Sequence, residues 1–152
     1  MLFFNRKKKI YSPCSGQVKA LSNVDDAVFS KGLAGDGFAV IPDDSVVSSP
    51  VDGTVTMIFP TKHAIGITDA EGHDYIVHIG IDTVNLKGNG FEVLVKERQQ
   101  IKAGFPLVNV DYTVLKEHGL ASDVIVLLGT GLKMNLTVSG NVKSGQEVGS
   151  CE

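Results

Sequence analysis

Short runs of β-branched and aliphatic residues recur along this chain from Ile10 onward, and each run is bounded by glycine, proline, asparagine or aspartate. Runs of this length and composition are typical of strands joined by tight turns. The clearest of them cover residues 37–41, 54–59, 65–68, 75–81, 91–95, 123–128 and 136–138. We therefore expect an all-β protein, built as a β-sandwich or a flattened barrel.

Helical signals are sparse, so we expect at most one or two short helical turns. Asp111 can cap a turn that carries Val114 and Leu115, and Gly119 is a natural stop for it. No other segment resembles a helix.

One internal repeat is visible. Residues 12–18 (SPCSGQV) and residues 49–55 (SPVDGTV) share a Pro-x-x-Gly turn that leads into a β-branched residue. Two turns of the same kind suggest a chain that is folded over on itself. The 17 glycines suit this arrangement, because tight corners need a residue without Cβ.

Length and composition favour one folded unit. The chain has 152 residues, 43% of them apolar, which is enough for one ordinary hydrophobic core. We assign residues 10–152 to a single domain and residues 1–9 to a basic amino-terminal tail that we expect to be disordered. The tail joins a short apolar cluster to a basic run, so it should touch an anionic membrane weakly at most. With no bilayer-spanning run and no secretory signal, we expect a cytoplasmic protein.

The charge is unevenly distributed. Four of the 14 basic residues lie at positions 6–9, which leaves ten basic against 17 acidic residues in the rest of the chain. That part would repel nucleic acid and favour a partner with a basic surface. The two cysteines, Cys14 and Cys151, have neither the spacing of a disulfide framework nor that of a zinc site.

His78 lies in an alternating run. Side chains of a strand point to opposite faces in turn, so Tyr75, Val77, Ile79 and Ile81 form one apolar row. His78 and Gly80 belong to the opposite row. If the apolar row fills the core, the imidazole of His78 lies on the outer face, with room beside Gly80 for a large group or for the backbone of another protein.

A second histidine, His63, opens the preceding predicted strand. A short turn at residues 70–74 connects that strand to the strand of His78, so an antiparallel hairpin could place the two imidazoles side by side. A lone strand histidine is more often a half-exposed polar residue without chemistry, and spacing alone does not decide between the two interpretations. His73 in a turn and His118 at the end of the predicted helix read as surface residues.

Residues 61–64 (TKHA) and 77–91 (VHIGIDTVNLKGNGF) resemble the two histidine motifs of the glucose-family IIA components of the bacterial phosphoenolpyruvate-dependent sugar phosphotransferase system. Residues 26–29 (DAVF), 35–42 (GDGFAVIP) and 50–55 (PVDGTV) add to the resemblance, in the family's order. The similarity covers most of residues 10–128. Residues 129–152 follow the family pattern loosely, and the basic amino-terminal segment is short.

The resemblance implies a β-sandwich phosphoryl carrier. In it, His78 would be phosphorylated by the phosphocarrier protein HPr and would pass the phosphoryl group to a IIB domain, so that sugar uptake is coupled to sugar phosphorylation. His63 would contact the phosphoryl group, and Thr61 would orient His63. A neutral imidazole is nucleophilic near neutral pH, and its phosphoramidate is labile enough to be passed on. No metal, nucleotide or other cofactor is required, although adventitious zinc could bind between His63 and His78.

The resemblance also implies a docking surface around the histidines, apolar at its centre and acidic at its rim. Such a surface suits a partner that bears arginine, including regulatory proteins. Phe59 and Val84 could equally belong to the core. The partner-binding positions are Asp26, Val28, Phe29, Leu33, Phe59, Ile76, Gly80, Asp82 and Val84.

Two other classes of protein match the sequence less well. Zinc peptidases of related architecture use a His-x-His pair, but the residue two positions after His78 is Gly80, which offers no ligand. A biotinyl or lipoyl carrier would present its lysine on a tight hairpin flanked by methionines. Lys133 follows a glycine-rich stretch and has a methionine, Met134, on one side only.

Overall fold

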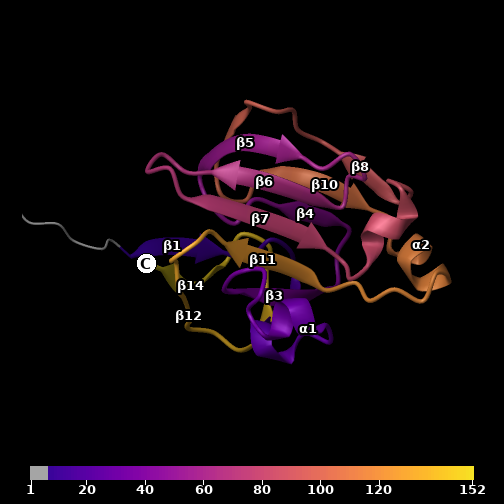
Figure 1. Cartoon of the computed structure of the whole chain (residues 1–152), viewed down its shortest axis with the longest axis horizontal. Coiled ribbons are helices and arrows are strands. Elements are labelled where there is room, and N and C mark those ends of the chain that lie inside the picture. The colour runs from indigo at the N-terminus through magenta and orange to yellow at the C-terminus, as the bar shows by residue number, and fades with distance from the viewer. Residues whose placement is uncertain (1–6) are drawn as a thin grey trace, which may run out of the picture.

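Strands dominate the computed structural model, which describes residues 7–152 (Figure 1). Within that part, helical structure is limited to α1 (Ala27–Ser30), α2 (Tyr112–Glu117) and two 3-10 turns, η1 (Leu21–Asn23) and η2 (Thr83–Leu86). The strands are β1 (Lys8–Tyr11), β2 (Gly16–Ala20), β3 (Gly37–Pro42), β4 (Val46–Ser48), β5 (Gly53–Ile58), β6 (Ala64–Thr68), β7 (Asp74–Ile79), β8 (Phe91–Val93), β9 (Gln100–Ile101), β10 (Pro106–Val110), β11 (Val124–Leu128), β12 (Met134–Leu136), β13 (Gly140–Val142) and β14 (Glu147–Cys151). The all-β prediction is confirmed.

The strands form one large sheet and two small ones. The large sheet has eight strands in the order β13-β2-β3-β11-β7-β6-β5-β9, and the small sheets have the orders β1-β14-β12 and β4-β10-β8. All the strand pairs are antiparallel, and the sheets are open. The architecture is therefore a β-sandwich, in which the large sheet forms one layer and the two small sheets form the other.

The two halves of the large sheet have equivalent strand orders when each is followed from its edge to the centre of the sheet. If β13, β2, β3 and β11 are matched with β9, β5, β6 and β7, the centre of the match falls between β11 and β7, where Val126 lies opposite Val77. The backbone hydrogen bonds on the two sides of this centre are also equivalent. Gly80 N donates to Asp123 O, and Gly129 N donates to Asp74 O, both at 2.8 Å. The two halves of the molecule are thus related by an approximate twofold axis.

The repeated turns of the sequence lie at equivalent places in the two halves. Ser12 Oγ donates to Cys14 O at 2.7 Å, and Ser49 Oγ donates to Val51 O at 2.6 Å. Each turn then enters a strand through a glycine, at the start of β2 and of β5. The predicted repeat is therefore a structural repeat.

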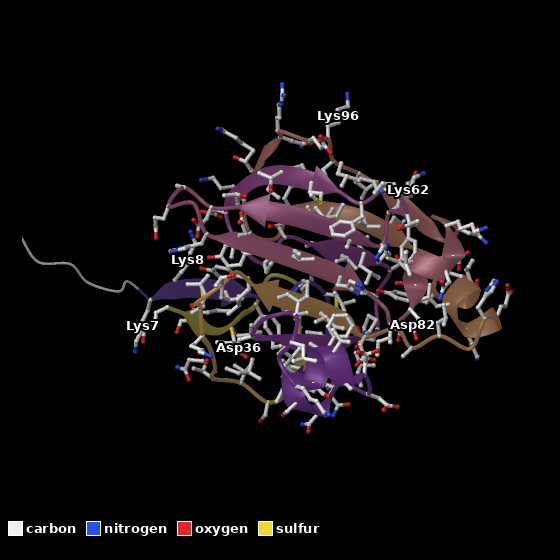
Figure 2. The ribbon with its side chains drawn as sticks, in the orientation of Figure 1. Lys7, Lys8, Asp36, Lys62, Asp82 and Lys96 are labelled. Carbon is white, nitrogen blue, oxygen red and sulfur yellow. The ribbon has the colours of Figure 1, made fainter. Side chains whose placement is uncertain are left out.

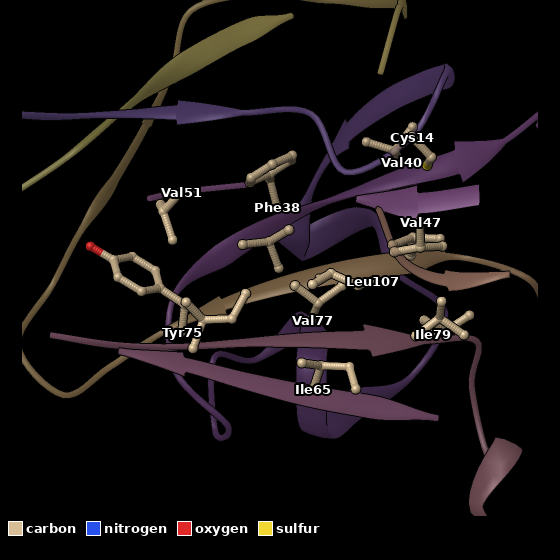
Figure 3. Packing of buried hydrophobic residues seen from close by; sticks show 14 of the residues in the cluster. Cys14, Phe38, Val40, Val47, Val51, Ile65, Tyr75, Val77, Ile79 and Leu107 are labelled. Carbon is tan, nitrogen blue, oxygen red and sulfur yellow. The ribbon is translucent and has the colours of Figure 1, made fainter. Parts of the chain in front are cut away.

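The main core lies between the large sheet and the two small sheets (Figure 3). Tyr75, Val77 and Ile79 of β7 are buried in it, as the alternation of that strand predicts, together with Phe38 of β3 and Leu107 of β10. Full burial of a large apolar side chain contributes about 1.5–3 kcal/mol, so this layer supplies most of the driving force for folding.

A second, smaller apolar cluster covers the outer face of the large sheet. It consists of Leu21, Val24, Phe29, Ala39, Ile81, Ile125 and Leu127, with Ile76 packed against it. The assignment of Ile81 to the main core row is therefore wrong. β7 ends at Ile79, and Gly80 takes a φ of +78°, so the chain turns and Ile81 faces the other cluster.

Within the described residues, the amino-terminal tail is shorter than predicted. Lys8 and Lys9 were assigned to the tail but belong to β1, because their backbones pair with Cys151 and Ser150 of β14. Lys8 Nζ also lies 3.1 Å from Oδ2 of Asp69, whose side chain is fully buried. The remainder of the predicted tail, residues 1–6, lies outside the described residues.

The predicted helix is α2, and the Asp111 side chain accepts a hydrogen bond from Thr113 N as its cap. Gly119 follows it with a φ of +68°. The short helix α1 was not predicted as a helix, and the strand expected at 136–138 is β12, which ends at Leu136. Across residues 7–152, the helices are all too short to cross a bilayer.

Candidate active site

His78 lies on the outer face of β7, beside the second cluster, as the alternation of the strand predicts. Its Nδ1 is 2.9 Å from Gly80 O. A carbonyl oxygen only accepts hydrogen bonds, so Nδ1 must carry the proton and donate it. The lone pair of the neutral ring then lies on Nε2, which is the nucleophilic atom.

Gly80 has a different role from the one expected. It was predicted to leave open room for a partner beside His78, but it is buried, and a Cβ at this position would collide with Thr83 Cγ2 and lie 3.0 Å from Ala121 O. Its φ of +78° favours glycine as well. Gly80 therefore orients His78 through its carbonyl, and the expectation of open space is wrong because η2 fills that space.

His63 lies at the end of the β5–β6 hairpin. Phe59 N donates to Ala64 O at 3.1 Å, which closes the loop, and Lys62 takes a left-handed φ of +63° within it. His63 is 5% exposed. Its Nδ1 lies 2.8 Å from Thr61 Oγ1, as expected of a threonine that orients the ring.

The two histidines meet as the hairpin interpretation predicted. Ala64, next to His63, pairs with His78 across the β6–β7 ladder, and Ile79 N donates to His63 O at 2.8 Å. The ring centroids of His63 and His78 are 5.0 Å apart, with an interplanar angle of 82°. Both Nδ1 atoms are already bonded, so the remaining nitrogens of the pair are the two Nε2 atoms.

The surroundings keep His78 neutral. Burial and, to a smaller extent, the nearby His63 lower its pKa to about 4, against the opposing effects of the Gly80 carbonyl, Asp26 and Asp82. Burial also lowers the pKa of His63, partly offset by the backbone carbonyl of Thr61. At neutral pH the pair therefore presents an unprotonated Nε2 on His78.

Two aromatic rings flank the histidines. Phe29 packs on His78 with ring centroids 5.0 Å apart, and Phe59 meets the edge of His63 at 5.6 Å. Neither Phe59 nor Val84 belongs to the main core. The core alternative for these two residues is therefore wrong.

Three aliphatic members of the surface are exposed, namely Val28 at 51%, Leu33 at 72% and Val84 at 49%. Ile76 is half-buried. The acidic members differ from each other. The Asp26 side chain accepts from Val28 N as the cap of α1, whereas Asp82 is exposed and its side chain caps nothing. Figure 2 shows Asp82 and Lys62 toward the end of the molecule that carries α2.

Sequence reasoning did not identify the Gly80 carbonyl or the capping role of Asp26. No sequence pattern marks the Gly80 carbonyl as an acceptor, because its position depends on the turn after β7. The cap by Asp26 does have a sequence signal, since an aspartate before a short apolar segment is a common helix start.

The remaining histidines lie away from this site. His118 ends α2, and its Nδ1 donates to Val114 O at 2.8 Å, as a surface residue at a helix end can. His73 is near Asp69 and Glu71, and the three offer ligand atoms within 4.8 Å of one another. However, both oxygens of Asp69 are engaged, one by the backbone N–H groups of Glu71 and His73, the other by the Tyr75 hydroxyl and Lys8. This group is a satisfied turn rather than a metal site.

A family profile described as "phosphoenolpyruvate-dependent sugar phosphotransferase system, EIIA 1" matches residues 8–134. The chain belongs to this EIIA 1 family. Members of the family are phosphotransferase components.

Relatives of two sizes match this EIIA 1 chain. It is 40% identical over 150 residues to the "PTS system glucose-specific EIIA component" of Mycoplasma capricolum subsp. capricolum, with 97% of each chain covered. It is 42% identical over 141 residues to the "PTS system glucose-specific EIICBA component" of Staphylococcus carnosus, which covers 91% of this chain but 21% of that protein. The "PTS system beta-glucoside-specific EIIBCA component" of Bacillus subtilis is 51% identical over 110 residues. The chain thus spans about a fifth of the length of several curated relatives.

A solved structure agrees with the fold of this EIIA 1 chain. Glucose permease IIA from Mycoplasma capricolum superposes with a TM-score of 0.85 at 39% sequence identity, and the match covers 99% of both chains.

Proposed function

We propose that this chain carries a phosphoryl group on Nε2 of His78, receiving it from phosphorylated HPr and passing it to a IIB domain during sugar uptake. The observation that carries the proposal is the bond from His78 Nδ1 to Gly80 O, because it directs the lone pair of a neutral imidazole outward. Family membership supports the relay as a whole.

In the forward step, the Nε2 lone pair attacks phosphorus while the bond between phosphorus and the donor nitrogen breaks. The Nδ1 proton stays on His78, held by Gly80 O, so the product ring carries a positive charge beside the phosphoryl oxygens. The second transfer reverses this movement toward the nucleophile of the IIB domain. In the transfer from HPr a phosphorus–nitrogen bond is made while another is broken, so this step needs positioning and charge stabilisation and no cofactor.

His63 supplies the stabilisation in this proposal. If the Thr61 hydroxyl donates to Nδ1, the proton of His63 lies on Nε2 and can be donated to a phosphoryl oxygen. Phe29 and Phe59 limit the access of water to the two rings. The free Nε2 atoms could also hold adventitious zinc, which would compete with phosphorylation.

The docking surface favours basic partners. Exposed aliphatic side chains around the histidines can exclude water, and Asp26 and Asp82 lie close enough to His78 to affect its titration. The names EIICBA and EIIBCA combine the A part with B and C parts, which supports a IIB domain as the acceptor. The relatives are named for glucose, glucosides and β-glucosides, so the sugar is set by the acceptor and not by this site.

The place of action we propose is the cytoplasm, where phosphoenolpyruvate is made. A weak membrane contact through the first nine residues is compatible with their composition, a short apolar cluster beside basic side chains.

Intact-mass measurement tests the proposal. Wild-type protein and the variants His78→Ala and His63→Ala are incubated with phosphoenolpyruvate, Enzyme I and HPr, with and without a zinc chelator. We expect the wild type to gain one acid-labile phosphoryl group and His78→Ala to gain none. We expect His63→Ala to accept the group but to pass it to a IIB domain more slowly, by up to about 10²-fold for the loss of one charge-stabilising donor. A wild-type protein that gains no phosphate while the upstream proteins are active would refute the proposal.

A further inference from the structure

The short helix α1 depends on one side chain. Asp26 adopts extended dihedral angles, and its Oδ1 accepts hydrogen bonds from Val28 N at 2.9 Å and from Phe29 N at 3.4 Å. A helix of four residues has few internal bonds, so its first N–H groups rely on such a cap. The backbone oxygen of Asp26 also accepts from Ser30 N at 2.8 Å, so both the side chain and the backbone carbonyl of Asp26 take part in the turn.

The turn places one aromatic ring. Phe29 is 9% exposed, and its ring centroid lies 5.0 Å from that of His78 with an interplanar angle of 60°. It packs within the second cluster, together with Ile81, Ile125 and Leu127. Val28, one position earlier, points outward and is half-exposed. The orientation of this turn therefore decides which of two neighbouring apolar side chains meets the histidine.

The contact with Phe29 helps to enclose the imidazole of His78. The bond to Gly80 O holds one ring nitrogen, and His63 approaches at nearly a right angle. Phe29 supplies a further side of the enclosure. Without it, water would reach the imidazole and any phosphoryl group attached to it.

We propose that Asp26 is a positioning residue for His78, because its cap on α1 holds Phe29 against the imidazole. This role is separate from a contribution to the acidic rim. Its consequence for phosphoryl transfer rests on the proposed function, but the placement of the ring does not.

Asp82 provides the matched comparison. It is the other acidic residue whose charge acts on His78, and its side chain makes no capping bond. The charge of Asp82 therefore acts on His78 without a capping bond. Asp82 has a left-handed φ of +61°, which asparagine tolerates better than alanine, so Asp82→Asn is the variant that removes this charge with the least strain.

The cap and the charge can be separated by the choice of substitution. Asparagine and serine cap helices about as well as aspartate, whereas alanine does not. Asp26→Asn and Asp26→Ser therefore remove the charge and keep the cap, and Asp26→Ala removes both. Loss of a cap corresponds to roughly a fivefold shift in the equilibrium between the formed and the open turn.

The experiment uses two measurements that need no partner protein. The first is the pKa of His78 by NMR in the unphosphorylated full chain, where the charged and titratable groups acting on the ring are His63, Asp26 and Asp82. The second is the lifetime of phosphohistidine formed chemically with phosphoramidate. The variants are Asp26→Ala, Asp26→Asn, Asp26→Ser, Asp82→Asn and Phe29→Ala.

We expect Asp26→Ala to have a higher His78 pKa than Asp26→Asn, because the ring becomes hydrated, and a phosphohistidine lifetime about fivefold shorter. Asp26→Ser should match Asp26→Asn, and Asp82→Asn should lower the His78 pKa in the same direction as Asp26→Asn, because each variant removes one acidic charge. Phe29→Ala keeps the Asp26 charge, so it should raise the His78 pKa above the wild-type value and shorten the phosphohistidine lifetime about fivefold, which keeps the test decisive if Asp26→Ala fails to fold. If Asp26→Ala and Asp26→Asn are alike, or if Phe29→Ala leaves both quantities at wild-type values, the inference is wrong. A failure of HPr to phosphorylate the wild type would refute the proposed function and leave these comparisons intact.

Discussion

At the scale of single residues, the candidate site depends on how the ring of His78 is held. Alternation along β7 correctly predicted that His78 lies opposite the buried Tyr75, Val77 and Ile79. The same alternation failed at Ile81, since strand periodicity ends where Gly80 turns the chain. A backbone acceptor such as Gly80 O leaves no trace in a side-chain pattern. The identity of the nucleophilic nitrogen therefore required the structure.

Gly80 should be the least replaceable glycine of the site. Gly80→Ala would place a Cβ in the left-handed region and against Thr83, so we expect a loss of about 2–4 kcal/mol in the free energy of unfolding. Gly131→Ala is the control, because its φ is +85° but nothing lies within 4 Å of the added Cβ. We expect about 1 kcal/mol for the control. Urea unfolding of both variants measures the difference, and equal losses would show that the space beside Thr83 is not tight.

The lowered pKa of His78 predicts a pH dependence. With a pKa of about 4 in the folded protein and a reference value near 6.5, His78 binds its proton in the unfolded chain first. Folding stability should therefore fall as pH is lowered from about 6.5 to about 4, and His78→Gln should remove this part of the slope. Denaturant titrations at several pH values measure it. A slope that is the same in the variant would contradict the assignment.

At the scale of the elements, the β5–β6 hairpin brings the second histidine to the first. The hairpin was predictable from the spacing of His63 and His78 and the turn between their strands, and the register confirms it. The loop conformation was not predictable, because Lys62 adopts a left-handed φ that lysine seldom takes. The helix α1 was missed because four residues are too few for a helical pattern to appear.

Within that hairpin, Thr61 should act through its hydroxyl group. Thr61→Val keeps the shape but removes the bond to His63, whereas Thr61→Ser keeps the bond. We expect Thr61→Val to pass its phosphoryl group to a IIB domain about tenfold more slowly, which corresponds to one net hydrogen bond, and Thr61→Ser to be close to wild type. Rapid-quench transfer assays measure both rates. Equal rates in the two variants would mean that the bond does not orient His63.

The ion pair of β1 should stabilise the fold at neutral pH. Burial alone would raise the pKa of Asp69, but hydrogen bonds from Tyr75, His73, Lys8 and Glu71 lower it to about 2. Lys8→Met should therefore cost about 1–3 kcal/mol at neutral pH, because a buried carboxylate loses its cation. The cost should shrink as pH falls through about 4 toward about 2, where Asp69 becomes protonated.

Lys9→Met provides the control for this pair. Lys9 and Glu147 are 3.7 Å apart but exposed, so their pair should contribute less than about 0.5 kcal/mol. Thermal unfolding of the two variants at neutral and at acidic pH gives the comparison. A loss of similar size in both variants would show that burial of Asp69 is not the cause.

At the scale of the whole molecule, the fold is a duplication that the sequence displays at one place. The repeated turns at 12–18 and 49–55 indicated two units, and the strand order of the large sheet extends the repeat to its eight strands. The pairing itself was beyond local patterns, because β3 meets β11 some 80 residues later and the second unit is inserted within the first. The site lies beside the centre of the duplication, on β7, but in one half only. Leu127 matches His78 about the central Val126–Val77 pair, so the other half lacks the nucleophile.

The position of the phosphoryl group is the most direct test of this account. Nitrogen-edited NMR of the phosphorylated, ¹⁵N-labelled protein reports which ring nitrogen is bonded to phosphorus and which carries the proton. We predict phosphorus on Nε2 of His78, a protonated Nδ1 bonded to Gly80 O, and an unmodified His63. Phosphorus on Nδ1 of His78, or on either nitrogen of His63, would contradict the account.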